Sequence, residues 1–125
     1  MKKQKTISLI EVLITLAILT GGIVFVFRGF MTSLSAANLS QNIMLSCFLA
    51  EDRLWQIEEM KKQKTTPEIS GLEILNMQNK EFSVKYEISQ TSIAGLDKLN
   101  ISVSWPKDKR SSHSVDFSTY LVDAN

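Results

Sequence analysis

The residue whose position most directly suggests chemistry is Glu11, a single carboxylate inside the apolar run from Ile7 to Phe27. An ionised side chain at the centre of a bilayer costs about 2.5–3.5 kcal/mol, so such groups are retained where they have a role. Because Glu11 lies near the start of the run, two interpretations are open. It reaches back to pair with Lys5 or a lipid headgroup, or it binds a cationic group of another chain.

The other reactive side chains stand alone. His113 is the only histidine and Cys47 the only cysteine, so the chain has neither metal-ligand spacing nor a nucleophile pattern. We expect His113 to be a partly buried residue at the start of a strand and Cys47 to pack inside a helix. Four dispersed aspartates are expected to be solvated: Asp97, Asp108, Asp116 and Asp123. The sequence therefore predicts no enzyme, no cofactor and no metal site.

The apolar run is long enough to cross a membrane. About 21 residues at a rise of 1.5 Å give roughly 31 Å, the thickness of the hydrocarbon core. Lys2, Lys3 and Lys5 precede the run, which places the N-terminus in the cytoplasm and the remainder outside. A secretory signal peptide would have a shorter apolar core of about 7–15 residues. With 14 basic and 13 acidic residues and no basic stripe, nucleic acid is not an expected partner.

The residues around Glu11 form an ordered pattern. Ile7, Ser8, Leu9, Ile10 and Glu11 are followed by a mostly aliphatic stretch, residues 12–18. This pattern resembles the N-terminus of the type IV pilins and type II secretion pseudopilins. The resemblance implies that residues 1–6 are a leader, that a prepilin peptidase cuts between Thr6 and Ile7, and that Ile7 is then N-methylated. The family leader ordinarily ends in Gly, and Thr6 stands in that place here.

The resemblance also implies an assembly and a location. Glu11 would pair with the Ile7 amine of a neighbouring subunit, and the partners would be the inner membrane, other pilin or pseudopilin subunits and the assembly platform. The head would be periplasmic, and after assembly it would belong to a periplasmic filament. Residues 102–121 resemble the C-terminal hairpin of minor pseudopilins. The alternative is an unprocessed, single-pass, membrane-anchored binding module.

Beyond Phe27, the apolar residues recur every three or four positions, which predicts an amphipathic helical half over residues 28–64. The predicted buried stripe comprises Leu39, Ile43, Cys47, Ala50, Leu54, Ile57 and Met60, broadened by Met44, Phe48 and Trp55. Together with residues 7–27 this gives one helix of about 55 residues, ended by Pro67. Gly21 and Gly22 either soften the helix or allow close contacts with other helices.

Residues 65–125 show the alternation of β-strands. The predicted inward faces are Phe82, Val84, Tyr86 and Ile88; Leu99, Ile101, Val103 and Trp105; and Val115, Phe117, Thr119 and Leu121. The intervening loops are too short for helical crossovers, so we expect antiparallel pairing, with residues 71–77 as an additional edge strand. The sequence therefore predicts an α+β fold, a long helix packed on a small antiparallel sheet of three or four strands, as in pilins.

Overall fold

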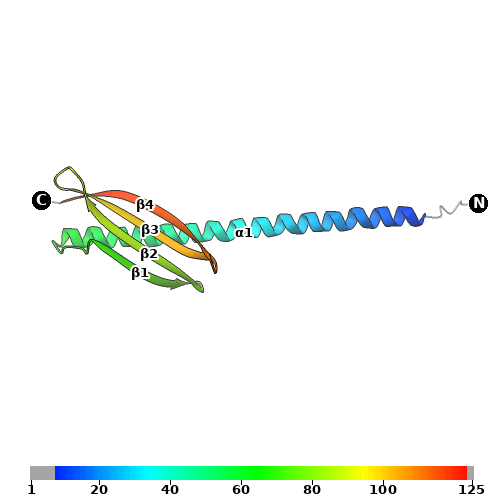
Figure 1. Ribbon diagram of the computed structural model, residues 1–125, viewed down its shortest axis with the longest axis horizontal. Helices are drawn as coiled ribbons and strands as arrows, with labels where there is room; N and C mark the ends of the chain where they lie inside the picture. The colour runs from blue at the N-terminus through cyan, green and yellow to red at the C-terminus, as the bar shows by residue number, and fades with distance from the viewer. Residues whose placement is uncertain (1–7, 124–125) are drawn as a thin grey trace, which may run out of the picture. The chain divides into compact units, whose positions relative to one another are not determined.

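The structure is a computed structural model that describes residues 8–123. One helix, α1 (Leu9–Lys62), spans 54 residues, which confirms the predicted single helix of about 55. The chain divides after Ser40 into two units: the first contains the N-terminal part of α1, and the second contains the remainder of α1 and a four-stranded sheet (Figure 1).

Both ends of α1 have identifiable local causes. At the start, the Ser8 carbonyl accepts hydrogen bonds from the amides of Glu11 and Val12, at 2.9 and 3.2 Å. At the end, the Thr65 amide donates to the Met60 carbonyl at 3.0 Å, and Lys64 adopts a left-handed φ of 56°. A left-handed residue just after the last turn is a usual way to satisfy terminal carbonyls and stop a helix.

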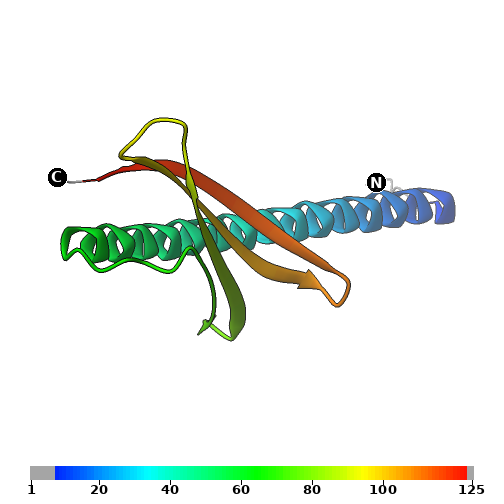
Figure 2. The ribbon, with the colours of Figure 1, turned by 60° about the vertical axis from the view of Figure 1, so that its left-hand side comes forward.

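The sheet has the order β1-β2-β3-β4, with every neighbouring pair antiparallel. Its strands are β1 (Ser70–Met77), β2 (Lys80–Gln90), β3 (Leu96–Asp108) and β4 (Ser111–Val122). Gln78 and Asn79 join β1 to β2 with φ values of 50° and 64°, as a two-residue hairpin with right-handed strand twist requires. The strands twist visibly from one edge to the other (Figure 2). The antiparallel sheet and its additional edge strand are therefore confirmed.

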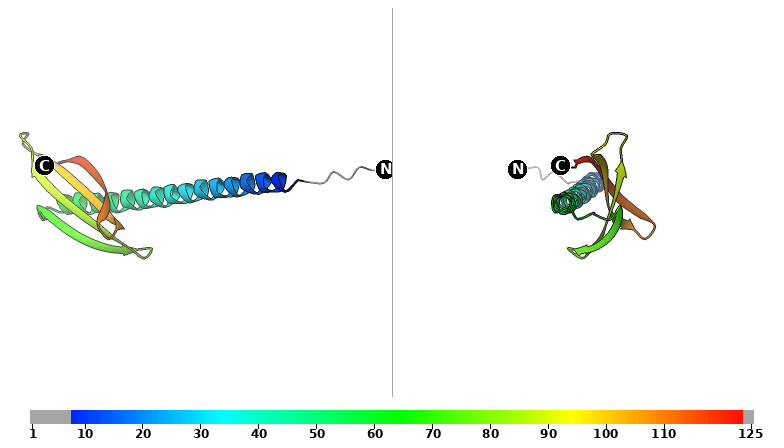
Figure 3. Two further views of the ribbon diagram at one scale, coloured as in Figure 1. Left: turned by 45° about the vertical axis from the view of Figure 1, so that its right-hand side comes forward. Right: turned by 90° about the vertical axis from the view of Figure 1, so that its left-hand side faces the viewer.

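The core of the second unit lies between the sheet and one side of α1. Phe82, Val84, Leu99 and Val103 are buried completely or almost completely. The remaining inward residues are buried or packed against this core, including Tyr86, Ile88, Ile101, Trp105, Val115, Phe117 and Leu121. Seen almost along the helix, the sheet curves around the C-terminal part of α1 (Figure 3, right). The alternation that predicted the inward faces is confirmed.

The helix face that meets the sheet agrees only in part with the predicted stripe: Ala50 and Ile57 are buried and Leu54 packs against the core, as predicted. Asn42, Ser46, Ala50 and Ile57 are the buried residues of α1, whereas Cys47 is exposed. The predicted contributors Leu39, Ile43, Met44, Phe48 and Trp55 are also exposed. The expectation that Cys47 packs inside was thus wrong, because the helix turns a partly polar side to the sheet and leaves much of its apolar side uncovered.

Candidate functional site

The first candidate site is the N-terminal part of α1. This helix is long and apolar enough to cross a membrane, and none of its most apolar stretch is buried. Leu13, Ile18, Phe25 and Phe30 illustrate the pattern, each being more than half exposed. Apolar side chains on every side of a helix are typical of a segment surrounded by lipid or by other helices. The helix is therefore a candidate single-pass membrane anchor.

Glu11 lies in the first turn of this anchor, where α1 begins. Its side chain is exposed and has no ion-pair partner among residues 8–123. The position is electrostatically favourable, because the amide groups at a helix N-terminus carry partial positive charge worth about 0.3–1 kcal/mol to a carboxylate. That interaction does not neutralise a full charge, so Glu11 remains available to a cation.

The hydroxyl groups of the anchor are satisfied within the helix. Thr15 Oγ1 donates to the Glu11 carbonyl at 2.6 Å, and Thr20 Oγ1 donates to the Leu16 carbonyl at 2.5 Å. Thr32 Oγ1 makes the same bond to the Arg28 carbonyl at 2.9 Å. Lipid offers no alternative partner for a hydroxyl, so these internal bonds reduce the penalty for placing threonine there. Glu11 remains the one acidic side chain in residues 8–27.

Gly21 and Gly22 lie within an uninterrupted stretch of α1. A Cβ atom added to either glycine would meet no other group within 4 Å. Gly22 also contributes to a shallow apolar groove of about 600 Å³, together with Ile18, Ile23 and Phe30 among others. Such a groove suits close approach by another helix. Helix softening by the two glycines stays a prediction, because α1 shows no break here.

Several predicted site residues lie outside the described part of the chain. These are the leader and orientation residues Lys2, Lys3 and Lys5 and the two residues of the predicted cleavage junction, Thr6 and Ile7. The described chain starts at Ser8, immediately after that junction, and places Ser8 and Glu11 one helical turn apart, joined by a backbone hydrogen bond. Cleavage and N-methylation stay predictions.

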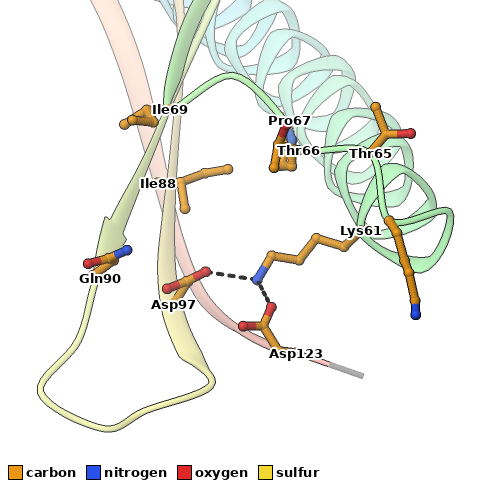
Figure 4. A pocket seen from close by; sticks show the side chains of 10 residues that line it. Lys61, Thr65, Thr66, Pro67, Ile69, Ile88, Gln90, Asp97 and Asp123 are labelled. Carbon is orange, nitrogen blue, oxygen red and sulfur yellow. Dashed lines mark hydrogen bonds and ion pairs between the residues drawn. The ribbon is translucent and has the colours of Figure 1, made fainter. Parts of the chain in front are cut away.

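The second candidate site is a cluster at the C-terminal end of α1 (Figure 4). Lys61 Nζ donates to Asp97 Oδ2 and to Asp123 Oδ1, both at 2.8 Å. The Lys61 side chain is only 16% exposed. Its partial burial lowers the pKa of Lys61, but the hydrogen bonds to Asp123 and Asp97 and the attraction of both carboxylates outweigh this effect, so the pKa is raised. One ammonium group thus ties the helix end to β3 and to the end of β4.

A pocket of about 780 Å³ opens beside this cluster. Its apolar wall includes Pro67, Ile69 and Ile88, and its polar wall includes Lys61 and Asp97, as Figure 4 shows. Both carboxylates already accept a hydrogen bond from Lys61, so neither is left unpaired to bind a ligand in the pocket. Within residues 8–123, no group of three His, Cys, Asp or Glu side chains could hold a metal ion. The cluster therefore acts as a structural tie.

The expectation that all four aspartates are solvated was wrong for Asp97, which is largely covered. Asp108, Asp116 and Asp123 are exposed as predicted, although Asp123 also pairs with Lys61. The sequence could not reveal this tie, because the partners of Lys61 are 36 and 62 residues away. His113 is partly buried beside Trp105, with 5.7 Å between the ring centroids, as expected for a residue at the start of a strand.

Sequence reasoning also missed a second tie between α1 and the sheet. Arg53 pairs with Glu73 of β1, and its guanidinium group lies 5.4 Å from the ring centroid of Tyr86. Asn42 Oδ1 accepts a hydrogen bond from Lys80 Nζ at 3.1 Å. These contacts explain why a polar side of α1 faces the sheet. A buried polar group is tolerated when its hydrogen bonds are satisfied. Asn42 is satisfied by Lys80 of the sheet, and buried Ser46 donates to the Asn42 carbonyl within the helix at 2.8 Å.

Comparisons of the chain with protein family models, with curated proteins and with solved structures found no match.

Proposed function

We propose that this chain is a structural subunit, a minor pilin or pseudopilin, that is stored in a membrane and then assembles into a type IV pilus or type II secretion filament. One observation carries the proposal. The residues Ile7, Ser8, Leu9, Ile10 and Glu11 stand directly after a basic leader in the sequence, and an uninterrupted helix begins at Leu9. The α+β head, with the end of α1 packed on an antiparallel sheet, is compatible with this function.

The proposed first step is processing at the membrane. A prepilin peptidase cuts between Thr6 and Ile7 and methylates the new Ile7 amine, which remains basic. Removal of the leader takes away Lys2, Lys3 and Lys5 and leaves a cationic group at the end of the anchor. Each mature subunit then carries one positive group at Ile7 and one negative group at Glu11.

The proposed second step is assembly by charge pairing. Glu11 of one subunit binds the Ile7 amine of the next while the apolar faces of the two helices pack together. An ion pair at 4 Å is worth about 4 kcal/mol at an effective dielectric constant of 20, and insertion of one charge into lipid costs about 2.5–3.5 kcal/mol. The two energies are similar in size. Pairing therefore offsets the cost of Glu11 and sets the register between neighbouring helices.

The proposed location follows from the same features. The anchor crosses the bacterial inner membrane with its N-terminus in the cytoplasm, and the head is periplasmic before and after assembly. The partners are the prepilin peptidase, other pilin or pseudopilin subunits and the assembly platform of the machinery. The head would contact neighbouring subunits or cargo.

Two measurements test this proposal. The full chain is produced with a prepilin peptidase, and the N-terminus of the product is identified by mass spectrometry. We expect it to be N-methylated Ile7. Assembly is then followed by the amount of the chain in sheared filaments. Glu11→Gln keeps the size of the side chain and removes its charge, so we expect normal cleavage and loss of most filament incorporation.

The matched control for assembly is Glu81→Gln, the same chemical change at an exposed residue of β2. We expect this variant to be cleaved and incorporated like the unaltered chain. Normal incorporation of Glu11→Gln would refute the pairing mechanism. An uncut chain that keeps Met1 in the presence of active peptidase would instead support the membrane-anchored binding module, which the threonine before the junction favours.

A further inference from the structure

Within the sheet, the exposed large apolar side chains lie on the two edge strands. In the described part of the sheet, the exposed large apolar residues are Leu72, Ile74 and Met77 on β1 and Tyr120 and Val122 on β4. The outward side chains of the middle strands are mainly polar or charged; they include Ser83, Lys85, Glu87, Asn100, Ser102 and Ser104. Apolar surface on the sheet is therefore confined to the places where another strand could be added.

Neither edge has the features that usually prevent strand addition. Edge strands are commonly protected by lysine, proline or a bulge. The sequences of β1 and β4 contain no lysine and no proline, and each has a single acidic residue, Glu73 and Asp116. The only irregularity in register lies between Pro106 and Asp108, far from Tyr120 and Val122. Within the described chain, β1 and β4 each pair on one side only.

On β1, the register shows which backbone groups face the open edge. The Ile88 amide donates to the Ile69 carbonyl at 2.8 Å, so this opposed pair is hydrogen-bonded across to β2. Opposed residues alternate between bonded and non-bonded pairs along an antiparallel ladder. The bonded set therefore continues with Gly71 and Glu73, and the amide and carbonyl groups of Leu72 and Ile74 point to the open edge.

On β4, the same alternation shows which backbone groups face the open edge. The Asp123 amide donates to the Gly95 carbonyl at 2.9 Å, which makes this opposed pair a bonded one. The amide and carbonyl groups of Val122, Tyr120 and Ser118 are then directed away from β3. On both edges, the residues with available backbone groups are those whose side chains lie on the face away from α1. A coplanar extension of the sheet requires this match.

The directions of the strands also agree. In the order β1-β2-β3-β4, each strand runs opposite to its neighbour, so β4 of one chain placed beside β1 of another continues the antiparallel alternation. If Tyr120 is opposed to Ile74, then Val122 is opposed to Leu72. Cross-strand apolar and aromatic pairs of this kind each contribute about 0.2–1 kcal/mol. If the pairing register between the two chains shifts by two residues, Val122 is opposed to Ser70 and one of the two apolar cross-strand pairs is lost.

We propose that a second copy of this chain docks by strand addition, its β1 edge pairing with the β4 edge of the first copy. The contact is head to tail, so each chain offers a different edge. Two heads then share a sheet of eight strands. A third copy would exceed the roughly ten strands that a twisted open sheet usually reaches, so pairing is expected to stop at two copies. This inference concerns the head and does not depend on cleavage or on Glu11.

The test is site-directed disulfide formation with the full, uncleaved chain in detergent, with micelles in molar excess over protein. All variants carry Cys47→Ser, which removes the native thiol. One chain carries Asn76→Cys and the other, with a different tag, carries Ser118→Cys. In the proposed register these residues form a bonded pair, whose Cα atoms lie about 5.5 Å apart, within the span of a disulfide. The four apolar edge residues stay in place.

We expect the mixed variants to form a disulfide at least about five times faster than either variant alone. Ile74→Lys on the Asn76→Cys chain should slow this reaction at least about fivefold, the factor that corresponds to one strong cross-strand pair. The matched control is Ile93→Lys, in the β2–β3 loop, where the side chain is 62% exposed compared with 54% for Ile74. It should leave the rate unchanged.

Other outcomes would overturn the proposal. If two chains of the same variant form a disulfide faster than the mixed variants do, this would indicate that β1 pairs with β1 or β4 with β4. Equal slowing by Ile74→Lys and Ile93→Lys would indicate non-specific collision. Absence of the mixed disulfide, in chains with unaltered far-ultraviolet circular dichroism, would show that a second copy does not occupy these edges.

Discussion

The side of α1 that packs on the sheet is tested by the same substitution at two isoleucines of the helix. Ile57 has no exposed surface, whereas Ile43 is 39% exposed. Both residues belong to the apolar stripe that periodicity predicted to be buried. Replacement of each by alanine therefore compares the packed side of the helix with a side that the sequence suggested equally.

The expected magnitude for Ile57→Ala follows from its burial. The change removes three carbon atoms, worth about 0.8 kcal/mol each when fully buried, which gives about 2.4 kcal/mol. The cavity left behind adds to this, so we expect the free energy of unfolding of the head to fall by about 3–4 kcal/mol. For Ile43→Ala, the small loss of contact is offset by the higher helix propensity of alanine, and we expect a change below about 0.5 kcal/mol.

The assay is urea unfolding of the full chain in detergent, followed by the fluorescence of Trp105. This residue is buried in the core, and the exposed Trp55 is replaced by phenylalanine in all samples to remove its background. With slopes of about 1–3 kcal/mol per molar urea for small domains, a loss of about 3–4 kcal/mol in Ile57→Ala should lower the midpoint by roughly 1–4 M. Losses within about 0.5 kcal/mol of each other at the two positions would refute the helix orientation described above.

Three further predictions concern the ties and the glycines. The pKa of Lys61 is raised on folding, so the charged side chain stabilises the folded head fully below the usual value of 10.5, and this contribution is lost as the pH rises above that value. The free energy of unfolding, measured between about pH 8 and 11.5, should therefore fall at the alkaline end. Lys61→Met should remove this pH dependence. Gly71→Ala should destabilise the head by about 1–3 kcal/mol in the same urea assay, because the new Cβ atom would clash with the ring of Tyr86. Gly22→Ala should leave the urea midpoint unchanged, because the space around Gly22 is open. Thr6→Gly should speed the appearance of the Ile7 N-terminus when the chain is made with a prepilin peptidase, and an unchanged rate would show that Thr6 does not limit processing.

Periodicity predicted the elements of this fold but could not orient the helix. The inward strand residues were predicted because a strand has only two faces, and alternation decides between them. On α1, apolar residues from Leu39 to Trp55 extend around more than one side, so no single stripe is distinguished. The packed side combines apolar residues such as Ala50 and Ile57 with polar residues whose partners are distant in sequence. Buried Asn42, for example, accepts a hydrogen bond from Lys80, 38 residues away.

The candidate sites differ in how far the sequence could reveal them. Glu11 was identified because a charged residue within an apolar run can be recognised from the sequence alone. The tie of Lys61 to Asp97 and Asp123 joins three segments whose proximity depends on the tertiary fold. Each of these residues is individually ordinary for a helix end, a strand start or a strand end. Only the packing of α1 on the sheet gives them a shared role.

The two units of the chain have different requirements for a partner. The first unit suits anchoring, and the head suits recognition of a specific partner. The first unit exposes apolar side chains all around α1, so lipid or other apolar helices must cover it, and almost any such helix satisfies that need. The head has a core of its own, formed between the sheet and the end of α1. The head can be recognised through two open strand edges. On both edges, the residues with available backbone groups point their side chains away from α1, and these side chains include apolar ones. In the proposed assembly, selectivity between subunits is therefore expected to reside in the head, and the proposed pairing of Glu11 would add register within the membrane.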